Sequence, residues 1–315
     1  MFQRLAARSV TLALLLGGLL FPPAFAMAQS GFPPPVPATP FAIGATQEPA
    51  TAPDMPAAAV RPTAVGLRLY TLDCGRIQVP DMGMFSDTGE YDGQPGTLVS
   101  PCFVIVHPAG TLLWDAGFGD KLAGQGPVTV EGGIVLQVDR SLQSQLQLIG
   151  VQEIDYLGFS HLHFDHTGNA TAFRNAQWLV NGRELEAALN HPDDFINLDD
   201  IRPSRQTRQL TLNGDHDVFG DGTVRILHAP GHTAGHQVLL LQLAKSGPVI
   251  LSGDLYHTHD NRRYQRVPAF NASRADTLAS MNRIETLARN LGARIIIQHD
   301  PDEFAALPPP PAYLD

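Results

Sequence analysis

The sequence predicts a layered α/β fold. Three observations favour this class: short apolar runs of strand length recur along the chain, helical apolar stripes lie between some of them, and turn residues separate the segments. The run 154–159 is typical of a buried strand, whereas Leu278, Met281 and Ile284 recur on one face of a helix. Because 43% of the 315 residues are hydrophobic and 17% are charged, the chain can build a sizeable core.

The predicted elements follow one another along the chain. Residues 108–110, Pro-Ala-Gly, predict a hairpin turn between two early strands. Leucines at helical spacing predict a helix over 141–149, and the capping box 273–276 starts a longer one. Apolar runs predict strands at 67–73, 102–107, 111–115, 154–159, 178–180, 223–228, 237–243, 249–251 and 293–298.

The N-terminal region predicts export. Two arginines precede an uncharged apolar stretch at 10–21, and small residues form cleavage sites that end at Ala26 and Ala28. This stretch is shorter than the ~20 residues of a spanning helix. We therefore expect a signal peptide over 1–28, cleavage, no stable membrane insertion afterwards, and a periplasmic or secreted protein.

Composition divides the remainder of the chain. Residues 29–64 are rich in Pro, Ala and Thr, which predicts a disordered linker. The folded domain is expected over 65–307, followed by a Pro-rich tail at 308–315. A formal net charge of −10 excludes a protein that grips nucleic-acid phosphates, and two cysteines cannot build a Cys-rich zinc site.

Metal-binding residue types cluster directly after the run 154–159. Within six residues the chain carries His161, His163, Asp165 and His166. Neutral imidazole and carboxylate are donors that divalent zinc, iron, manganese and cobalt accept. Four such groups exceed what one catalytic metal usually takes from a single loop, so the pattern predicts two metal ions. A lone histidine is usually a hydrogen-bonded core or surface residue, but a cluster of this density indicates a metal site.

Further donors follow later strands. His232 lies in a glycine-punctuated loop after the strand 223–228, Asp254 follows 249–251, and His299 follows 293–298. Because α/β folds gather ligands at the carboxyl ends of strands, we expect these side chains to meet the first cluster.

The ordered pattern resembles the dinuclear metallo-β-lactamase superfamily across residues 65–307. The residues that carry the resemblance are His161, His163, Asp165, His166, His232, Asp254 and His299. The resemblance implies a four-layer αββα sandwich with the site at one edge of its sheets. It implies that His161, His163 and His232 bind the first metal. It also implies that Asp165, His166 and His299 bind the second, with Asp254 bridging both.

Within the superfamily the chain resembles the N-acyl homoserine lactone lactonases. The supporting segments are 69–75, 113–118, 161–168, 230–237 and 298–301. These enzymes commonly place a tyrosine three residues after the bridging aspartate, where it contacts the lactone carbonyl; here that position is His257, with Tyr256 one residue earlier. We expect either side chain to donate a hydrogen bond to the carbonyl.

These residues predict a quorum-quenching hydrolase that opens a lactone by attack of a metal-bound hydroxide. Asp165 would pass a proton to the leaving oxygen. Zinc is the expected metal, with iron, manganese or cobalt as alternatives. Another ester or thioester hydrolase of the same fold, or an exported metal-binding protein without turnover, remains open. The oligomeric state is also open.

Other residues receive narrower predictions. His236 is expected to support the metal ligands or to pack rather than bind metal, and Asp115 is expected either to support the metal-binding histidines or to be an ordinary turn aspartate. Cys74 and Cys102 are expected to be buried free thiols, with a disulfide as the alternative. The long loop 80–99, which contains Phe85, is predicted either to cover a substrate's acyl chain or simply to pack.

Overall fold

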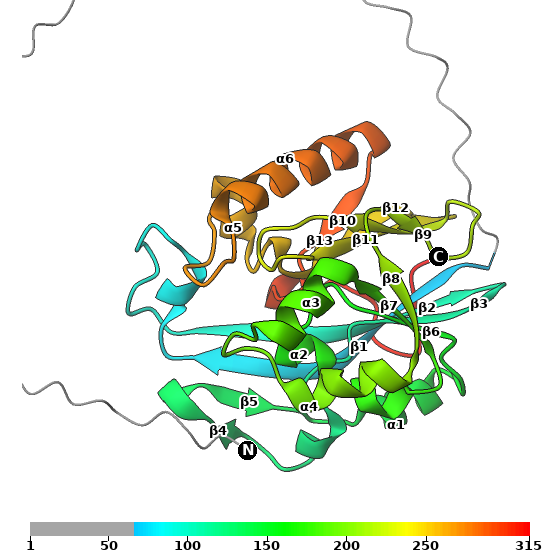
Figure 1. The fold of residues 1–315 in the computed structure, drawn as a ribbon, viewed down its shortest axis with the longest axis horizontal. Coiled ribbons are helices and arrows are strands. Elements are labelled where there is room, and N and C mark those ends of the chain that lie inside the picture. The colour runs from blue at the N-terminus through cyan, green and yellow to red at the C-terminus, as the bar shows by residue number, and fades with distance from the viewer. Residues whose placement is uncertain (1–65) are drawn as a thin grey trace, which may run out of the picture. The chain divides into compact units, whose positions relative to one another are not determined.

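The computed structural model describes residues 66–315, which form two β-sheets with helices on both outer faces (Figure 1). The larger sheet has the order β4-β5-β1-β2-β3-β6-β7-β8 and the smaller has the order β13-β12-β11-β10-β9. The strands of the larger sheet are β1 (Arg68–Val79), β2 (Gly96–His107), β3 (Gly110–Trp114), β4 (Val128–Thr129), β5 (Val135–Gln137), β6 (Tyr156–Gly158), β7 (Gln177–Asn181) and β8 (Arg208–Leu212). The strands of the smaller sheet are β9 (His216–Asp217), β10 (Val224–His228), β11 (Gln237–Leu243), β12 (Gly247–Leu251) and β13 (Arg294–Ile296).

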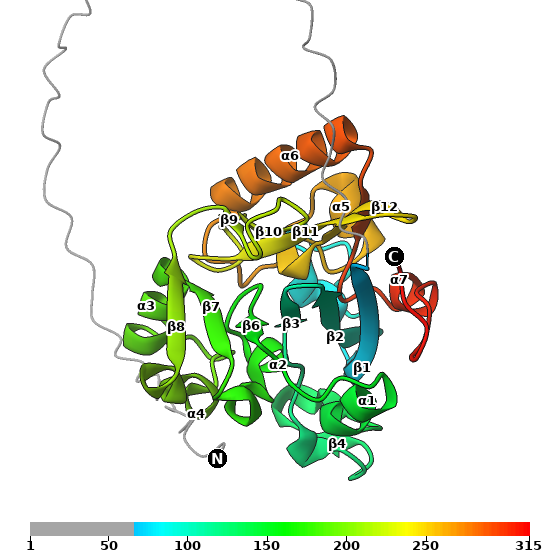
Figure 2. The same cartoon turned by 90° about the vertical axis from the view of Figure 1, so that its right-hand side faces the viewer.

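The helices divide between the two outer faces. In chain order they are α1 (Leu142–Leu148), α2 (Phe164–Thr167), α3 (Gly182–Asn190), α4 (Leu198–Ile201), α5 (His259–Tyr264), α6 (Arg274–Leu291) and α7 (Pro301–Ala305). Figure 2 shows α6 against the smaller sheet, with α1, α3 and α4 against the larger one. The predicted signal peptide 1–28, the linker 29–64 and residue 65 lie outside the described residues.

Alternating side chains explain how each sheet is buried on both faces. Phe103 and Trp114 of the larger sheet pack against Leu239 and Leu251 of the smaller sheet in the central core. The opposite face of the larger sheet packs against helices, since Trp178 shares a buried apolar cluster with Leu146 of α1 and Ile201 of α4. The opposite face of the smaller sheet packs against α6. The predicted αββα four-layer sandwich is therefore confirmed.

The local signals for the hairpin and the longest helix are confirmed. β2 and β3 pair antiparallel around the Pro108–Gly110 turn. The Ser273 side chain accepts a hydrogen bond from the backbone N–H of Asp276, and α6 ends at Gly292 with φ 64°. None of the helices within residues 66–315 is long and apolar enough to cross a membrane.

The first two strands extend beyond the predicted runs. β1 continues to Val79 across a register irregularity between Asp73 and Arg76, and β2 already begins at Gly96. The segment predicted as a loop over 80–99 is therefore shorter than expected, and it contains a short 3₁₀ helix at Met82–Phe85. The sequence does not display these extensions as apolar runs, because residues 76–79 of β1 alternate between exposed and buried and β2 begins with the partly exposed Gly96 and the exposed Thr97.

The cysteine prediction is wrong. Cys74 and Cys102 form a disulfide, with their Cα atoms 5.7 Å apart. Leu72 pairs with Cys102 in the β1–β2 register, and the irregularity after Asp73 brings Cys74 beside the same partner. Strand register decides this pairing, and the sequence alone does not specify that register.

The C-terminal boundary at residue 307 is also wrong. Leu314 pairs with Leu69 of β1 through backbone hydrogen bonds of 2.8 and 3.0 Å, and its side chain packs against the central core. The segment 308–315 therefore belongs to the folded unit, because a single hydrophobic residue near its end pairs with the first strand.

Candidate metal centre

All seven predicted ligands meet at one place in the structure. The segment 161–166 follows β6, His232 connects β10 to β11, Asp254 lies in a 3₁₀ turn after β12, and His299 follows β13. Each of the seven residues is buried, with at most 7% of its surface exposed. The ends of strands from both sheets thus bring the predicted side chains together, as the sequence predicted.

The first group of donors consists of His161, His163, His232 and Asp254. Their ligand atoms all lie within 4.8 Å of one another. His232 Nε2 lies 3.2 Å from His163 Nδ1 and 3.3 Å from Asp254 Oδ2. His161 Nε2 lies 3.7 Å from the same carboxylate oxygen. These atoms surround a common centre.

The second group consists of Asp165, His166 and His299, again within 4.8 Å of one another. Asp165 Oδ2 lies 3.5 Å from His166 Nε2 and 3.7 Å from His299 Nε2. Oδ1 of Asp254 lies 3.1 Å from His166 Nε2 and 2.9 Å from His299 Nε2. Asp254 therefore presents one carboxylate oxygen to each group.

The free ring nitrogens show that the two groups fit metal ions. Nε2 of His161 and Nε2 of His166 are buried without a hydrogen-bond partner among residues 66–315. Their Nδ1 atoms are occupied, by Ser160 Oγ at 3.0 Å and Asp115 Oδ2 at 2.9 Å. A ring held on one side with a free nitrogen on the other is how proteins orient metal-binding histidines. The chemistry of the donors suits divalent cations.

The electrostatics favour the metal-binding protonation states in the first donor group. Burial lowers the pKa of His161 and of His232 well below the usual histidine range, so both rings are neutral. Burial by itself would raise the pKa of Asp254, but the surrounding histidines, His299 and His161 foremost, outweigh it and hold that pKa well below its usual range. Neutral imidazole and ionised carboxylate are the forms that bind metal. In the second group burial by itself would lower the pKa of His166 and of His299, but the carboxylates of Asp165 and Asp254 outweigh it and raise both.

Asp115 supports the second donor group through hydrogen bonds, which is one of the two roles that the sequence analysis expected. Its carboxylate accepts hydrogen bonds from the backbone N–H of Ser160 at 2.7 Å and from Gln298 Nε2 at 2.7 Å, besides its contact with His166. Asp115 is fully buried and adopts a positive φ of 58°. A non-glycine residue in this region costs free energy, so the surrounding contacts fix it there.

The other histidines of the two groups are also held from outside. His232 Nδ1 lies 3.1 Å from Asn271 Oδ1, and His299 Nδ1 lies within hydrogen-bond distance of the Val99 carbonyl oxygen at 2.6 Å. His163 Nε2 lies 3.4 Å from a carboxylate oxygen of Asp193. Each ring therefore has one nitrogen aimed at the donor groups and one aimed at the surrounding protein.

Glu184 and His236 tie the ligand-bearing loops together. The Glu184 carboxylate accepts from the backbone N–H of Leu162 at 3.0 Å and of Gly235 at 2.8 Å, which joins the loops that carry His163 and His232. His236 Nε2 accepts from the backbone N–H of Asp254 at 2.9 Å. His236 therefore acts on the backbone of a donor, in agreement with its predicted supporting role.

His257 lies at the centre, whereas Tyr256 does not. His257 Nε2 lies 3.0 Å from Asp254 Oδ2, and its ring stacks on His299 with centroids 5.4 Å apart. The hydroxyl of Tyr256 instead donates to Glu285 on α6 at 3.1 Å. The prediction of Tyr256 as a carbonyl donor is therefore wrong. Tyr256 has extended backbone, in which consecutive side chains point to opposite sides.

Three phenylalanines from separate loops surround the donors. Phe85 lies 5.0 Å from His257, Phe270 lies 5.7 Å from His232, and Phe195 lies 4.9 Å from Phe270, all measured between ring centroids. The segment predicted as a loop over 80–99 thus brings an aromatic ring to the metal centre.

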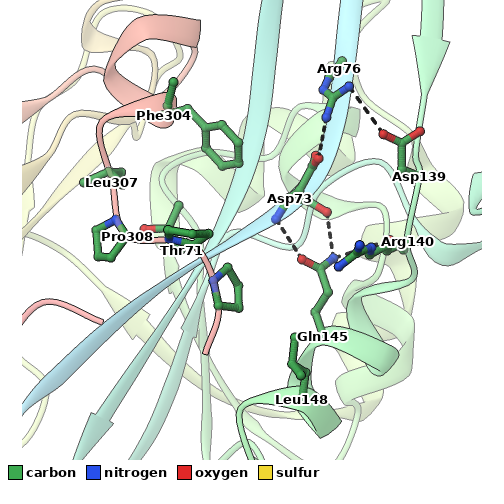
Figure 3. Close-up of a pocket in the computed structure, with 13 residues that line it drawn as sticks. Thr71, Asp73, Arg76, Asp139, Arg140, Gln145, Leu148, Phe304, Leu307 and Pro308 are labelled. Carbon is green, nitrogen blue, oxygen red and sulfur yellow. Dashed lines mark hydrogen bonds and ion pairs between the residues drawn. The ribbon is translucent and has the colours of Figure 1, made fainter. Parts of the chain in front are cut away.

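A surface groove of about 360 Å³ lies away from this centre. It runs between β1, α1 and the C-terminal segment, and Figure 3 shows Thr71, Leu148 and Phe304 on its walls. The seven donors are absent from its lining within residues 66–315. We therefore assign the chemistry to the donor groups and not to this groove.

The sequence analysis missed five supporting residues, one of which is Asp193 beside His163. Ser160 and Gln298 each directly precede a predicted ligand at the end of a strand, and that adjacency was a usable signal. Glu184 and Asn271 lie 21 or more residues from the ligands they support, so no local pattern indicates them.

Two buried groups of histidine and carboxylate donors around one shared aspartate, at the edge of an αββα sandwich, define a metal-dependent hydrolase. The profile of the metallo-beta-lactamase superfamily matches residues 95–299, and the chain belongs to this superfamily.

Individual relatives point to one branch. The chain is 34% identical over 264 residues to the N-acyl homoserine lactonase AttM of Azorhizobium caulinodans, covering 79% of this chain and 99% of the relative. It is 27% identical to the N-acyl homoserine lactonase AiiA of Bacillus thuringiensis subsp. kurstaki, over 78% of this chain and 98% of that one. A solved N-acyl homoserine lactone hydrolase, with N-hexanoyl-L-homoserine bound at its catalytic metal centre, superposes with a TM-score of 0.69 at 27% identity. That match covers 78% of this chain and 98% of the other.

Proposed function

We propose that this protein hydrolyses N-acyl homoserine lactones at a centre of two divalent metal ions. The observation that carries the proposal is the position of Asp254, whose two oxygens face two separate donor groups at 2.9–3.7 Å. A protein that only stores metal needs no shared carboxylate. The substrate class is supported by lactonase relatives that align over nearly their whole length.

Metal ions held by the two donor groups would supply the activation of water and of the substrate carbonyl. Two bound cations would lower the pKa of a bound water towards ~7 and polarise the ester carbonyl. We propose zinc, because histidine and carboxylate sets are its usual ligands, with iron, manganese and cobalt as the alternatives. The protein contributes seven fixed donor residues, and the two oxygens of one of them, Asp254, would set the separation of the two positions.

Asp165 is the proposed proton carrier. Its Oδ2 faces His166 and His299, the other members of the second donor group, and its side chain retains 10% exposure, more than that of His166. Opening a lactone breaks the ring C–O bond and leaves a carboxylate and an alcohol, so the departing oxygen needs a proton. A carboxylate at the edge of the metal centre can accept a proton from the nucleophile and deliver it there.

His257 is the proposed carbonyl donor. Its Nε2 faces the same oxygen of Asp254 as the first donor group does. A carbonyl that approaches this group therefore comes within reach of the ring. Phe85 and Phe270 pack around His257, with Phe270 6.1 Å away between centroids, and hold its orientation.

The aromatic side chains indicate where an acyl chain binds. Phe85, Phe195 and Phe270 contact one another or the donor histidines, and none of them belongs to the same secondary-structure element as another. We propose that the acyl chain of the substrate packs against these rings, because apolar surface next to a polar reaction centre favours an amphiphilic ligand.

We also propose that the protein works outside the cytoplasm. The arginines and apolar run within 1–28, the Pro-rich segment 29–64, and the disulfide between Cys74 and Cys102 support export to an oxidising compartment. N-terminal sequencing of protein from the native host should find Met27 or Gln29 first. An intact Met1 would contradict export.

Mass spectrometry of the reaction tests the proposed activity. Metal-loaded protein incubated with N-hexanoyl homoserine lactone should yield the ring-opened acid, and in ¹⁸O-labelled water the new carboxylate should carry the label. The Asp254→Ala variant is the matched control and should give no product above the buffer rate. Intact lactone after prolonged incubation with protein that holds two metals would refute the proposal.

A further inference from the structure

The Cys74–Cys102 disulfide lies directly against the segment 115–118. A Cβ placed on Gly117 would lie 2.3 Å from Cys74 Cβ and 3.3 Å from Cys102 Sγ, so the backbone at Gly117 rests on the bridge. The backbone N–H of Phe118 donates to the Cys74 carbonyl oxygen at 3.4 Å. The bridge therefore forms the surface on which this segment sits.

The opposite side of the same segment holds the turn that carries His166. The backbone N–H of Ala116 donates to the His166 carbonyl oxygen at 2.7 Å, and Gly168 N–H donates to the Gly117 carbonyl oxygen at 2.7 Å. Asp115 Oδ2 binds His166 Nδ1 at 2.9 Å. Both the backbone and the ring of this predicted ligand thus depend on the segment 115–118.

Support for the first donor group comes mostly from elsewhere. His232 is oriented by Asn271, and His163 by Asp193. His161 reaches Asp115 only through the Ser160 hydroxyl, which bonds both residues. A displacement of the segment 115–118 is therefore expected to reach the second donor group before the first.

The disulfide lies where the hydrogen-bonded ladder between β1 and β2 is interrupted. The β1–β2 register breaks between Asp73 and Arg76, so Cys74 lies in the interruption of the ladder. On the outer side, Asp73 exchanges two backbone hydrogen bonds with the Gln145 amide, at 3.0 and 2.8 Å, as the dashed lines in Figure 3 show. On the inner side, the covalent link to Cys102 takes the place of the missing ladder contacts.

The conformation of Asp115 explains why such a support is needed. Its φ of 58° lies in the left-handed region that L side chains rarely adopt, and the residue keeps it only while its surroundings fix it. Without a rigid base under Gly117, the segment can relax towards an ordinary backbone conformation and withdraw its carboxylate from His166.

We propose that the Cys74–Cys102 disulfide is a positioning element for the second metal site: it holds the segment 115–118 so that Asp115 orients His166. This rests on the proposed role of His166 as a ligand. The bridge is therefore more than a general staple of the fold, and its removal should affect one metal position and spare the other.

The test uses the full-length protein with both cysteines replaced, Cys74→Ala and Cys102→Ala. Zinc is titrated against a competing chelator to obtain two dissociation constants. Because the loss of a partner that orients a ligand typically weakens metal binding about 10- to 100-fold, we expect a loss of that size for one zinc and no change for the other. The His166→Ala variant identifies which constant belongs to the second site. Cobalt-substituted protein should show the absorption of a single site at cobalt concentrations that fill both sites of the wild type.

Two further variants separate positioning from general stability. Leu146→Ala removes a buried side chain of α1 from the same apolar cluster as the two cysteines and leaves the hydrogen-bond partners of segment 115–118 in place. This variant should bind both zinc ions as the wild type does. Asp115→Ala should lose the same zinc as the cysteine variant. Combining it with the cysteine replacements should cause little additional loss, because both changes act on one contact.

The outcomes are distinct. Two zinc ions bound at wild-type affinities by the folded cysteine variant, or equal zinc loss in Leu146→Ala, would overturn the inference. If the alanine variant does not fold, the Cys74→Ser and Cys102→Ser pair, which retains the side-chain volume better, gives the same readout. Wild-type protein that holds two zinc ions but leaves lactones intact would refute the proposed function and leave this inference standing.

Discussion

A single methyl group at Gly168 should separate the two segments that build the second donor group. A Cβ at this position would lie 2.1 Å from the Phe118 carbonyl carbon, 2.3 Å from its oxygen and 2.5 Å from the Gly119 nitrogen. Gly168 itself has ordinary helical φ and ψ of −58° and −25°, so alanine is excluded by this close approach and not by its own backbone. Ordinary contacts begin near 3.4 Å, so the segments must move apart by roughly 1 Å.

The structure gives the expected size of the effect. Backbone shifts forced by an added methylene cost typically 1–3 kcal/mol of stability, and we expect Gly168→Ala to fall in this range. His166 lies two residues earlier and bonds to the displaced segment, so its ring should move with the turn. A misplacement of about 1 Å at a reaction centre can lower turnover about 100-fold.

The assay measures kcat/KM for lactone opening, zinc content and chemical unfolding on the same preparation. Gly126→Ala is the matched control, because Gly126 has φ 74° and no atom within 4 Å of its added Cβ. The control should lose roughly 1–2 kcal/mol through backbone strain alone and keep wild-type kinetics. Gly168→Ala with wild-type kinetics and zinc content would refute the reasoning.

Three further predictions follow from the site and its surroundings. Replacing His257 with alanine should slow lactone opening by ~10²–10³ with zinc content unchanged. Tyr256→Phe should keep the wild-type rate and lose about 1 kcal/mol of stability, because it removes the hydrogen bond to Glu285. Stopped assays and zinc analysis of both variants check these rates and zinc contents. Asp254→Ala should lose zinc and activity together, measured by elemental analysis, and a zinc-replete but inactive variant would argue against a bridge. Burial raises the pKa of Asp200 from 3.8 to about 6. Ionisation of this buried carboxyl costs stability as the pH rises through that interval, so Asp200→Asn should stabilise the protein by about 1–3 kcal/mol at pH 8 and hardly at all near pH 3, as urea melts at the two pH values will show.

The sequence predicted the positions of the ligands because strand ends are chemically marked. Each donor follows an apolar run, and in an α/β sandwich the ends of such runs converge at one edge. The capping residue Ser273 and the terminating Gly292 likewise fixed the limits of α6 through local backbone chemistry alone. These features depend on short-range patterns, which a single sequence displays directly.

Features that depend on direction or register could not be predicted in this way. Tyr256 and His257 are adjacent in the chain, and the turn after Asp254 decides which of them faces the metal centre. The pairing of Cys74 with Cys102 depends on an irregularity in the β1–β2 ladder. A one-residue shift in the turn would have turned Tyr256 and not His257 towards the donor groups, and a one-residue shift in strand register would have left the cysteines apart. The residue types themselves are compatible with either arrangement.

The supporting residues show a second limit of sequence reasoning. Glu184 is a helix residue whose carboxylate accepts from Leu162 and Gly235, and its burial raises its pKa. A glutamate in the first turn of a helix is ordinarily read as an exposed residue that favours the helix N-terminus. Its actual role depends on contacts across 22 and 51 residues of sequence, which become visible only in the folded chain.

The central claim is that two donor groups around Asp254 form a lactone-opening centre, and a substrate competition tests it most directly. Purified protein loaded with two zinc ions per chain is assayed at equal concentrations of an N-acyl homoserine lactone, a linear ester, an acyl thioester and a β-lactam. The lactone should have the highest kcat/KM, and chelation should abolish its turnover until zinc is returned. Faster cleavage of the thioester or the β-lactam, or lactone turnover that persists without metal, would contradict the claim.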